Sequence, residues 1–252
     1  MTMTILTRKF GKCPPRRDPR TSRLSPSLAA WLPAVPDSVA WSRHVTYAMW
    51  GNDRYGDCAF AAMAALIGTW TKNAQAEVLL TTTMCLENYA ACTGFDPATG
   101  ANDDGTVLLD ALERWRRAGY ARPGQTRDYL TAFGTIDLHD HDGLRRAVAY
   151  LGGVYAGIQV PAYLMRADGD WRRDDGGDQT ILGGHCIAIV GYEPGWWHVF
   201  TWGGVRRMAV DLWDAIADEA YGLISRQNWL AVDGRTPRGE DVAALLQEMQ
   251  AA

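Results

Sequence analysis

The stretch Gly51–Gly68, GNDRYGDCAFAAMAALIG, decides how the rest of the chain is interpreted. Its first part is rich in Gly, Asn and Asp, which favour turns, and its second part is an alanine-rich run that predicts a helix. Cys58 stands at the junction, with Gly56 or Asp57 near the N-cap. A thiol at a helix N-terminus meets the positive end of the helix dipole, which stabilises the thiolate and lowers the pKa. The position indicates either a nucleophile or a small side chain buried in the core.

Composition limits the classes of protein to consider. A chain of 252 residues that is 47% apolar can build one large domain or two lobes around a shared core. The formal net charge of −4 argues against a protein that coats nucleic acid. The five cysteines include no CxxC pair, so we expect neither a disulfide framework nor a metal site, and no cofactor.

The start of the chain, MTMTILTRKFGK, contains no apolar core of a signal peptide. No apolar run in the sequence is long enough to cross a bilayer. We therefore expect a cytoplasmic protein in a reducing compartment, without a membrane partner.

The chain divides into three parts. Residues 1–36 contain KCPPRRDPRTSRLSPS, which is rich in Pro, Arg and Ser and has no periodic apolar pattern. This composition predicts an extended arm without packed elements, which either drapes over the surface or ties the domain to a neighbouring subunit. Residues 37–235 are expected to form the ordered domain, and residues 236–252 a C-terminal helix or tail.

The ordered part changes character near residue 140. Helical stretches are expected before this point, at 58–70, 76–92 and 103–120. After a short helix, strands are expected at 154–160, 185–192, 196–202, 205–210 and 221–226. The pattern predicts an α+β fold, with an N-terminal helical lobe at about 50–140 and a C-terminal antiparallel sheet or barrel lobe at about 141–235.

One of the five histidines is suited to act with Cys58. His185 follows LGG and begins HCIAIVGY, so it should stand at the exposed end of a buried strand in the second lobe. A cysteine and a histidine that face each other from two lobes can form the ion pair that a thiol nucleophile requires. Packing remains the alternative interpretation for Cys58.

Several segments together resemble the papain-like cysteine peptidase superfamily. NDRYGDCAFAA resembles its QGxCGSCWAFSA, GGHCIAIVGY resembles NHAVxVVGY, and FTWGG resembles NSWG. LPAVPDSVAWSR and LRRAVAYLGGVYAGIQV also match in order, so the resemblance covers roughly residues 33–225. The chain is similar, more narrowly, to proteins of tailed phages and prophages that share NDxxGDC. The resemblance implies a papain-like two-lobe fold.

The resemblance also implies roles for individual residues. Cys58 would be the nucleophile, and His185 would take and return its proton. The side-chain amide of Asn52, with the Cys58 backbone N–H, would form the oxyanion hole. Trp202 would shield the histidine from water.

The sequence departs from the family pattern at two positions. Asn52 is one methylene shorter than the family's glutamine. The asparagine that orients the histidine is missing, because Phe200 aligns with it. With a one-residue gap Thr201 would take this place, since its hydroxyl can accept the imidazole N–H.

Three functions remain open at this stage. The first is a thiol hydrolase that cleaves peptide or isopeptide bonds in a peptide or protein substrate. The second is a catalytically weak or inactive papain-like fold that serves as a virion or assembly protein, with residues 1–36 contacting capsid or tail proteins. The third is an acyltransferase or transglutaminase-like use of the same Cys–His pair. A phage origin would make the protein virion-associated.

Overall fold

The computed structural model describes residues 8–166 and 169–229, together with 235–237, 239, 241, 243 and 247. Most of the expected C-terminal element at 236–252 lies outside the described residues. Within the described part, no helix is both long and apolar enough to cross a membrane.

The helical lobe is built around α2 (Cys58–Asn73), which is buried along almost its whole length. Its alanines let neighbouring elements approach closely, and its larger side chains fill the space between them. Helices α3 (Thr82–Thr93) and α4 (Leu108–Ala118) cover α2; both were expected from the sequence, but they begin about five residues later than the expected stretches 76–92 and 103–120. The short strands β2 (Tyr120–Ala121) and β3 (Arg127–Asp128) pair with each other at the end of this lobe.

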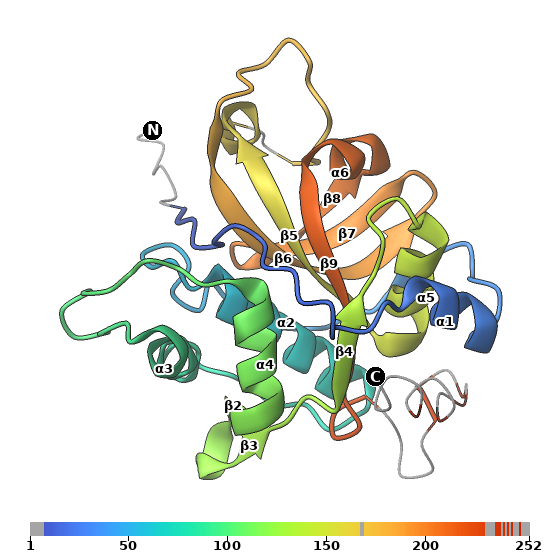
Figure 1. Ribbon diagram of the computed structural model, residues 1–252, viewed down its shortest axis with the longest axis horizontal. Coiled ribbons are helices and arrows are strands. Elements are labelled where there is room, and N and C mark those ends of the chain that lie inside the picture. Colours follow the sequence, from blue (N-terminus) through green and yellow to red (C-terminus); the bar gives the residue numbers. More distant parts are fainter. Residues whose placement is uncertain are drawn as a thin grey trace.

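The second lobe is a seven-stranded antiparallel sheet. Its order is β4–β9–β5–β6–β7–β8, with β1 beside β6, and α5 and α6 pack against it (Figure 1). The five strands expected from the sequence are all present. The bounds are β1 Val39–Ala40, β4 Ala132–Thr135, α5 His141–Leu151, β5 Val154–Pro161, β6 Ile181–Glu193, β7 Trp196–Thr201, β8 Gly204–Ala209, α6 Val210–Ile216 and β9 Ala217–Ile224.

Strand β6 joins the two lobes. Its side chains alternate between two cores, as a strand buried on both faces requires. Ile187 and Ile189 belong to the core beneath α5, whereas Cys186, Ala188 and Val190 pack in the core that contains α2. The alternation places His185 and Cys186 on opposite faces and confirms that Cys186 is a buried core residue.

Two boundaries differ from the sequence expectation. Strand β4 lies in the range assigned to the helical lobe but pairs with β9, so the sheet lobe begins before residue 140. The expectation of an unpacked arm is wrong for its last third, because α1 (Ser25–Trp31) packs on α5. Leu24 and Leu28 are fully buried there. Their spacing of four residues puts both side chains on one helical face.

The first described residues run between the two lobes. We call residues 8–13 the arm segment; Figure 1 shows it in dark blue, between α2 and α4 on one side and the sheet on the other. The Lys12 N–H donates to the Gly184 carbonyl of β6 (3.1 Å). On the other side the Cys13 N–H donates to the Thr106 carbonyl (2.9 Å), and the Thr106 N–H donates to the Gly11 carbonyl (2.8 Å). The arm segment therefore pairs with both lobes at once.

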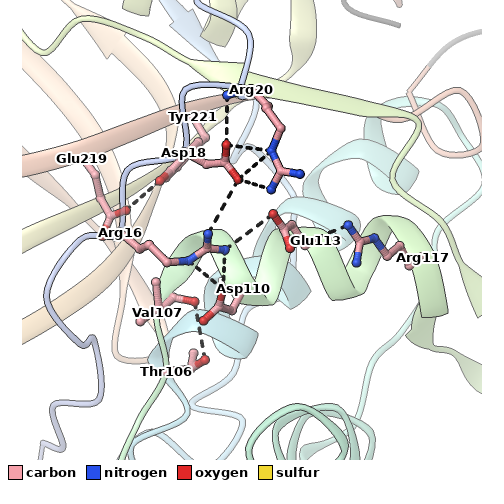
Figure 2. Close-up of polar contacts among 10 residues, drawn as sticks. All are labelled: Arg16, Asp18, Arg20, Thr106, Val107, Asp110, Glu113, Arg117, Glu219 and Tyr221. Carbon is pink, nitrogen blue, oxygen red and sulfur yellow. Dashed lines mark hydrogen bonds and ion pairs between the residues drawn. The ribbon is translucent and has the colours of Figure 1, made fainter. Parts of the chain in front are cut away.

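The next part of the arm lies on the surface of α4. We call residues 16–20 the outer arm. Figure 2 shows Arg16 reaching from the outer arm to α4, where its Nη2 lies 2.5 Å from Asp110 Oδ1 and 3.5 Å from Glu113 Oε1. Within the outer arm, Asp18 pairs with Arg20 (2.6 Å). These contacts are partly exposed to solvent, unlike the side chain of Lys12 in the arm segment.

Candidate functional site

Cys58 is the first residue of α2 and is almost completely buried. Its Sγ accepts a hydrogen bond from the Cys186 backbone N–H of β6 (3.4 Å). Burial raises the pKa of the Cys58 thiol to about 12, although the backbone N–H groups of Cys186, Gly11 and Ala59 oppose the shift. The expectation that the helix start lowers this pKa is wrong for this arrangement, because loss of water outweighs the helix dipole. With the arm segment in place, the sulfur is a neutral thiol.

His185 lies on β6 and is held by two residues from the end of β7. Its Nε2 is 2.9 Å from Thr201 Oγ1, and its ring stacks on Trp202 with centroids 4.0 Å apart and an interplanar angle of 11°. Its Nδ1 is buried and has no hydrogen-bond partner among the described residues. Burial, and to a lesser extent the positive charge of Arg8, lower the pKa of His185 to about 3. The imidazole is therefore neutral.

The contact with Thr201 resolves the ambiguity in the alignment of β7. Phe200 is buried on the other face of the strand, where its ring lies 5.2 Å from that of Tyr47 and 5.6 Å from that of Trp50. Thr201 faces the histidine because alternate residues of a strand point to opposite sides. The structure places a hydroxyl where the resemblance requires a group to orient the imidazole, and this role for Thr201 stays a prediction.

Asn52 and Trp202 meet at one carbonyl oxygen of the arm segment. The Lys9 carbonyl accepts hydrogen bonds from Asn52 Nδ2 (3.3 Å) and from Trp202 Nε1 (3.2 Å). Asn52 Nδ2 also donates to the Tyr55 carbonyl (3.2 Å), which fixes the orientation of the amide. Asn52 and Trp202 thus form a binding site for a carbonyl oxygen next to His185. The Lys9 carbonyl of the same chain occupies this site.

Two further groups of the arm segment, the Phe10 ring and the Gly11 N–H, lie beside His185 and Cys58. Phe10 packs edge-on against both His185 and Trp202, with centroid distances of 6.4 and 5.8 Å. The Gly11 amide is one of the groups that act on the Cys58 sulfur. The arm segment therefore covers both the thiol and the imidazole.

Glycines permit this close fit of backbone against backbone. A Cβ on Gly11 would overlap the carbonyl of Gly56, and a Cβ on Gly105 would overlap the carbonyl of Gly11. On the sheet side, a Cβ on Gly184 would overlap the carbonyl of Lys12. Any side chain at these positions would force the arm segment away from the lobes.

A further buried residue at the site was missed by sequence reasoning. Asp57 is fully buried beside Cys58, and Cys85 Sγ donates to its Oδ2 (3.6 Å). Burial raises the pKa of this carboxyl well above its usual range. The only signal in the sequence is an aspartate directly before the cysteine in GDC. Among the described residues, no three His, Cys, Asp or Glu side chains gather as a metal site.

Known structures share this arrangement of helical lobe and sheet. The chain superimposes on xylellain, a cysteine protease from Xylella fastidiosa, with a TM-score of 0.67 over 87% of this chain and 97% of that one, at 16% identity. The chain has the papain-like fold. Digestive procathepsin L 3 from Tenebrio molitor larval midgut matches over 87% of this chain and 77% of its own, with a TM-score of 0.58 and 17% identity. Bromelain from Ananas comosus, in complex with the inhibitor E64, matches over 76% of this chain and 100% of its own (TM-score 0.58, 17% identity).

The likeness to solved structures has no counterpart in the comparisons of the sequence. No protein-family model matches the sequence, and no curated protein matches it. The papain-like two-lobe α+β fold expected from the ordered motifs is confirmed by the solved structures. Cys58 starts α2 and bonds to the backbone of Cys186, the residue after His185 on β6, whereas the imidazole contacts Thr201 and Trp202, so the expected pairing of the thiol with the imidazole stays a prediction.

Proposed function

We propose that the protein is a papain-like thiol hydrolase that cleaves peptide or isopeptide bonds, and that the structure is its closed form. The observation that carries the proposal is the site built around the Lys9 carbonyl. Asn52 and Trp202 donate to this oxygen, while His185 beside them is oriented by Thr201. These groups are arranged for a carbonyl oxygen and a proton transfer, and a purely structural protein has no use for either.

The reaction would start when the arm segment leaves and water reaches Cys58 and His185. His185 would take the thiol proton, and the thiolate would attack the substrate carbonyl carbon to form a tetrahedral intermediate. The Cys58 N–H, which has no acceptor inside the helix, and Asn52 Nδ2 would stabilise the oxyanion. His185 would return the proton to the leaving amine, and water would then hydrolyse the thioester to give the acid and restore the thiol.

Gly11→Ala tests the proposal in the full chain without changing a reactive residue. The added methyl group would overlap the Gly56 carbonyl, so the arm segment should leave the lobes. Cys58 should then react with an epoxide inhibitor of the E-64 type at least about tenfold faster than in the unaltered protein near neutral pH, because its thiol regains water and a basic partner. Mass spectrometry of the peptide that contains Cys58 separates this labelling from that of the other four cysteines.

Two further variants complete this experiment. Cys58→Ser should abolish both labelling and cleavage of fluorogenic peptides. Thr201→Val, in the Gly11→Ala background, should lower kcat and leave KM nearly unchanged, because it removes the hydroxyl that holds His185. The proposal is overturned if hydrogen exchange shows the arm segment displaced in Gly11→Ala while Cys58 reacts no faster and no peptide is cleaved.

A second candidate is a non-catalytic papain-like protein that takes part in assembly. The burial of Cys58 and the replacement of the orienting asparagine favour it. Residues 8–32, however, pack on the chain's own lobes, which favours an intramolecular role for most of the arm. Co-purification with capsid or tail proteins, lost when the arm is altered by Gly11→Ala, would support this alternative.

A further inference from the structure

Lys12 occupies a buried pocket of the sheet lobe, and it directly follows Gly11, whose amide acts on the Cys58 sulfur. Its side chain is 0% exposed, and its Nζ lies 2.8 Å from Asp218 Oδ2 and 3.1 Å from Glu219 Oε1. Its backbone N–H bonds to Gly184, the residue before His185. A lysine that is fully buried with two carboxylates is unusual and requires a site built for it.

The body of the protein supplies every wall of this pocket. Gly157 of β5 forms its base, since a Cβ there would overlap the Lys12 side chain. Gln159 Nε2 donates to Asp218 Oδ2 (2.5 Å), and the Tyr221 hydroxyl donates to Glu219 Oε2 (2.8 Å). Both carboxylates are therefore held in place from the sheet. We call Gly157, Gln159, Asp218, Glu219 and Tyr221 the acidic pocket.

The acidic pocket needs a cation when the arm segment is absent. Burial raises the pKa of Glu219, and the charge of Lys12 opposes this shift. Burial alone would lower the pKa of Lys12, but the hydrogen bond to Asp218 and the two carboxylate charges outweigh it, so the net shift is upward. Two adjacent carboxylates without a counter-ion repel each other and are costly to keep from water.

Two other basic residues of the arm form ion pairs with acidic residues of the lobes. Lys9 lies 3.3 Å from Asp103, and Arg16 contacts Asp110 and Glu113, so the arm carries the cations and the lobes carry the anions. At Lys9, Lys12 and Arg16 the arm and the lobes therefore have complementary charges. A substrate that replaces the arm meets the same acidic surface.

We propose that the acidic pocket is the principal specificity subsite of the hydrolase, and that the substrate is a peptide with lysine or arginine at the position that enters it. The inference rests on the proposed function, because a specificity subsite requires a reaction. The carboxylates would bind the cationic head, and Gly157 would leave room for the long aliphatic stem. An apolar side chain in the same place would leave both carboxylates unpaired, which disfavours it strongly.

A positional library of fluorogenic peptides tests this subsite in the full chain carrying Gly11→Ala. At one position, lysine or arginine should be preferred over leucine by at least about tenfold in kcat/KM. Adding Asp218→Asn and Glu219→Gln should lower kcat/KM for the basic peptide by about 100-fold and leave cleavage of a leucine peptide nearly unchanged. Asp142→Asn on the exposed surface of α5 removes one charge outside the pocket and should leave the preference intact.

A binding measurement keeps the subsite testable if the double variant fails to fold. A synthetic peptide with the sequence of residues 7–14, TRKFGKCP, should bind Gly11→Ala protein at least about tenfold more tightly than the same peptide with norleucine in place of its second lysine. Cleavage with a preference for leucine or phenylalanine, or equal binding of the two peptides, overturns the subsite alone. If the arm segment is displaced and no library member is cleaved, the proposed function is overturned. Binding of the two synthetic peptides then still decides whether the acidic pocket prefers a cationic side chain.

Discussion

The arm segment and the outer arm are both held by the lobes, but by different kinds of interaction. The arm segment has backbone hydrogen bonds to both lobes and a lysine whose side chain is 0% exposed. The outer arm is held by Arg16, whose side chain is 40% exposed. Ion pairs in water contribute little, whereas a buried charge that loses its partner is costly. In the proposed closed form, residues 8–13 would therefore hold the site closed, and residues 16–20 would only adjust the strength of closure.

The largest effect is expected from Lys12→Met. This change leaves the buried Glu219 and the partly buried Asp218 without a cation and should weaken docking of the arm segment by about 3 kcal/mol. Hydrogen exchange at the amides of Lys12 and Cys13 measures it directly, because both donate across the junction of the lobes. Lys72→Met, which removes a surface pair with Glu77, is the control. Unchanged protection would show that the backbone bonds suffice without the lysine.

Phe10→Ala should weaken docking by a smaller amount. The ring packs edge-on against His185 and Trp202 but is only half-buried, so its loss should cost about 2 kcal/mol. The same exchange measurement applies, and Leu79→Ala, at an exposed position, provides the control. If protection does not change, the aromatic contact does not contribute to closure.

Acidification should open the site through His185. Its pKa is about 3 in the closed structure and 6.5 ordinarily. As the pH falls below 6.5, the His185 imidazole binds a proton in the open protein but stays neutral in the closed protein. Protonation therefore stabilises the open state relative to the closed state. The ratio of closed to open protein should fall by about tenfold between pH 7.5 and 5.5.

The fluorine NMR signal of a fluorophenylalanine placed at position 10 measures this ratio without thiol chemistry. His185→Gln should remove the pH dependence in this range. A ratio that changes equally in His185→Gln would assign the effect to other groups.

The smallest effect is expected for the outer arm. Arg16→Gln should change the ratio of closed to open protein by less than about threefold, because its partners on α4 are screened by water. High salt should have a similarly small effect on the unaltered protein and none on the variant. The control is Arg20→Gln, which removes the same charge. Its partner Asp18 lies within the outer arm, so this variant should not change the ratio of closed to open protein. A larger loss for Arg16→Gln would reverse the comparison between the two parts of the arm.

Local patterns predicted much of the fold correctly. The helix that begins at Cys58 and the strand that carries His185 both follow from short-range features, namely an alanine-rich run after a turn and an apolar run after glycines. Strand β4 was missed because four residues carry too little pattern, and it is stabilised by β9, far away in the sequence. Helix α1 was missed because the composition of residues 1–36 obscured the spacing of Leu24 and Leu28.

The acidic pocket could not be predicted from local pattern. The segment DLWDAIADEA was not expected to contain a strand, but α6 ends at Ile216 and β9 starts at Ala217. This boundary and the pairing of Glu219 with Gly157 bring the two carboxylates to the base of the pocket. Helix and strand are close in propensity here, and pairing with β5 decides between them.

The sequence by itself indicated the helical and sheet lobes and nominated Cys58, His185, Asn52 and Trp202, because apolar periodicity and ordered motifs act over a few residues at a time, whereas the contact with His185 favoured Thr201 over Phe200. Only the tertiary structure decided that residues 8–13 run between the lobes, cover the thiol and place Lys12 on Asp218 and Glu219. These contacts join segments up to 206 residues apart through backbone bonds and buried charges. These contacts are stable because water is excluded when the arm segment packs between the lobes. A local sequence pattern cannot predict this exclusion of water.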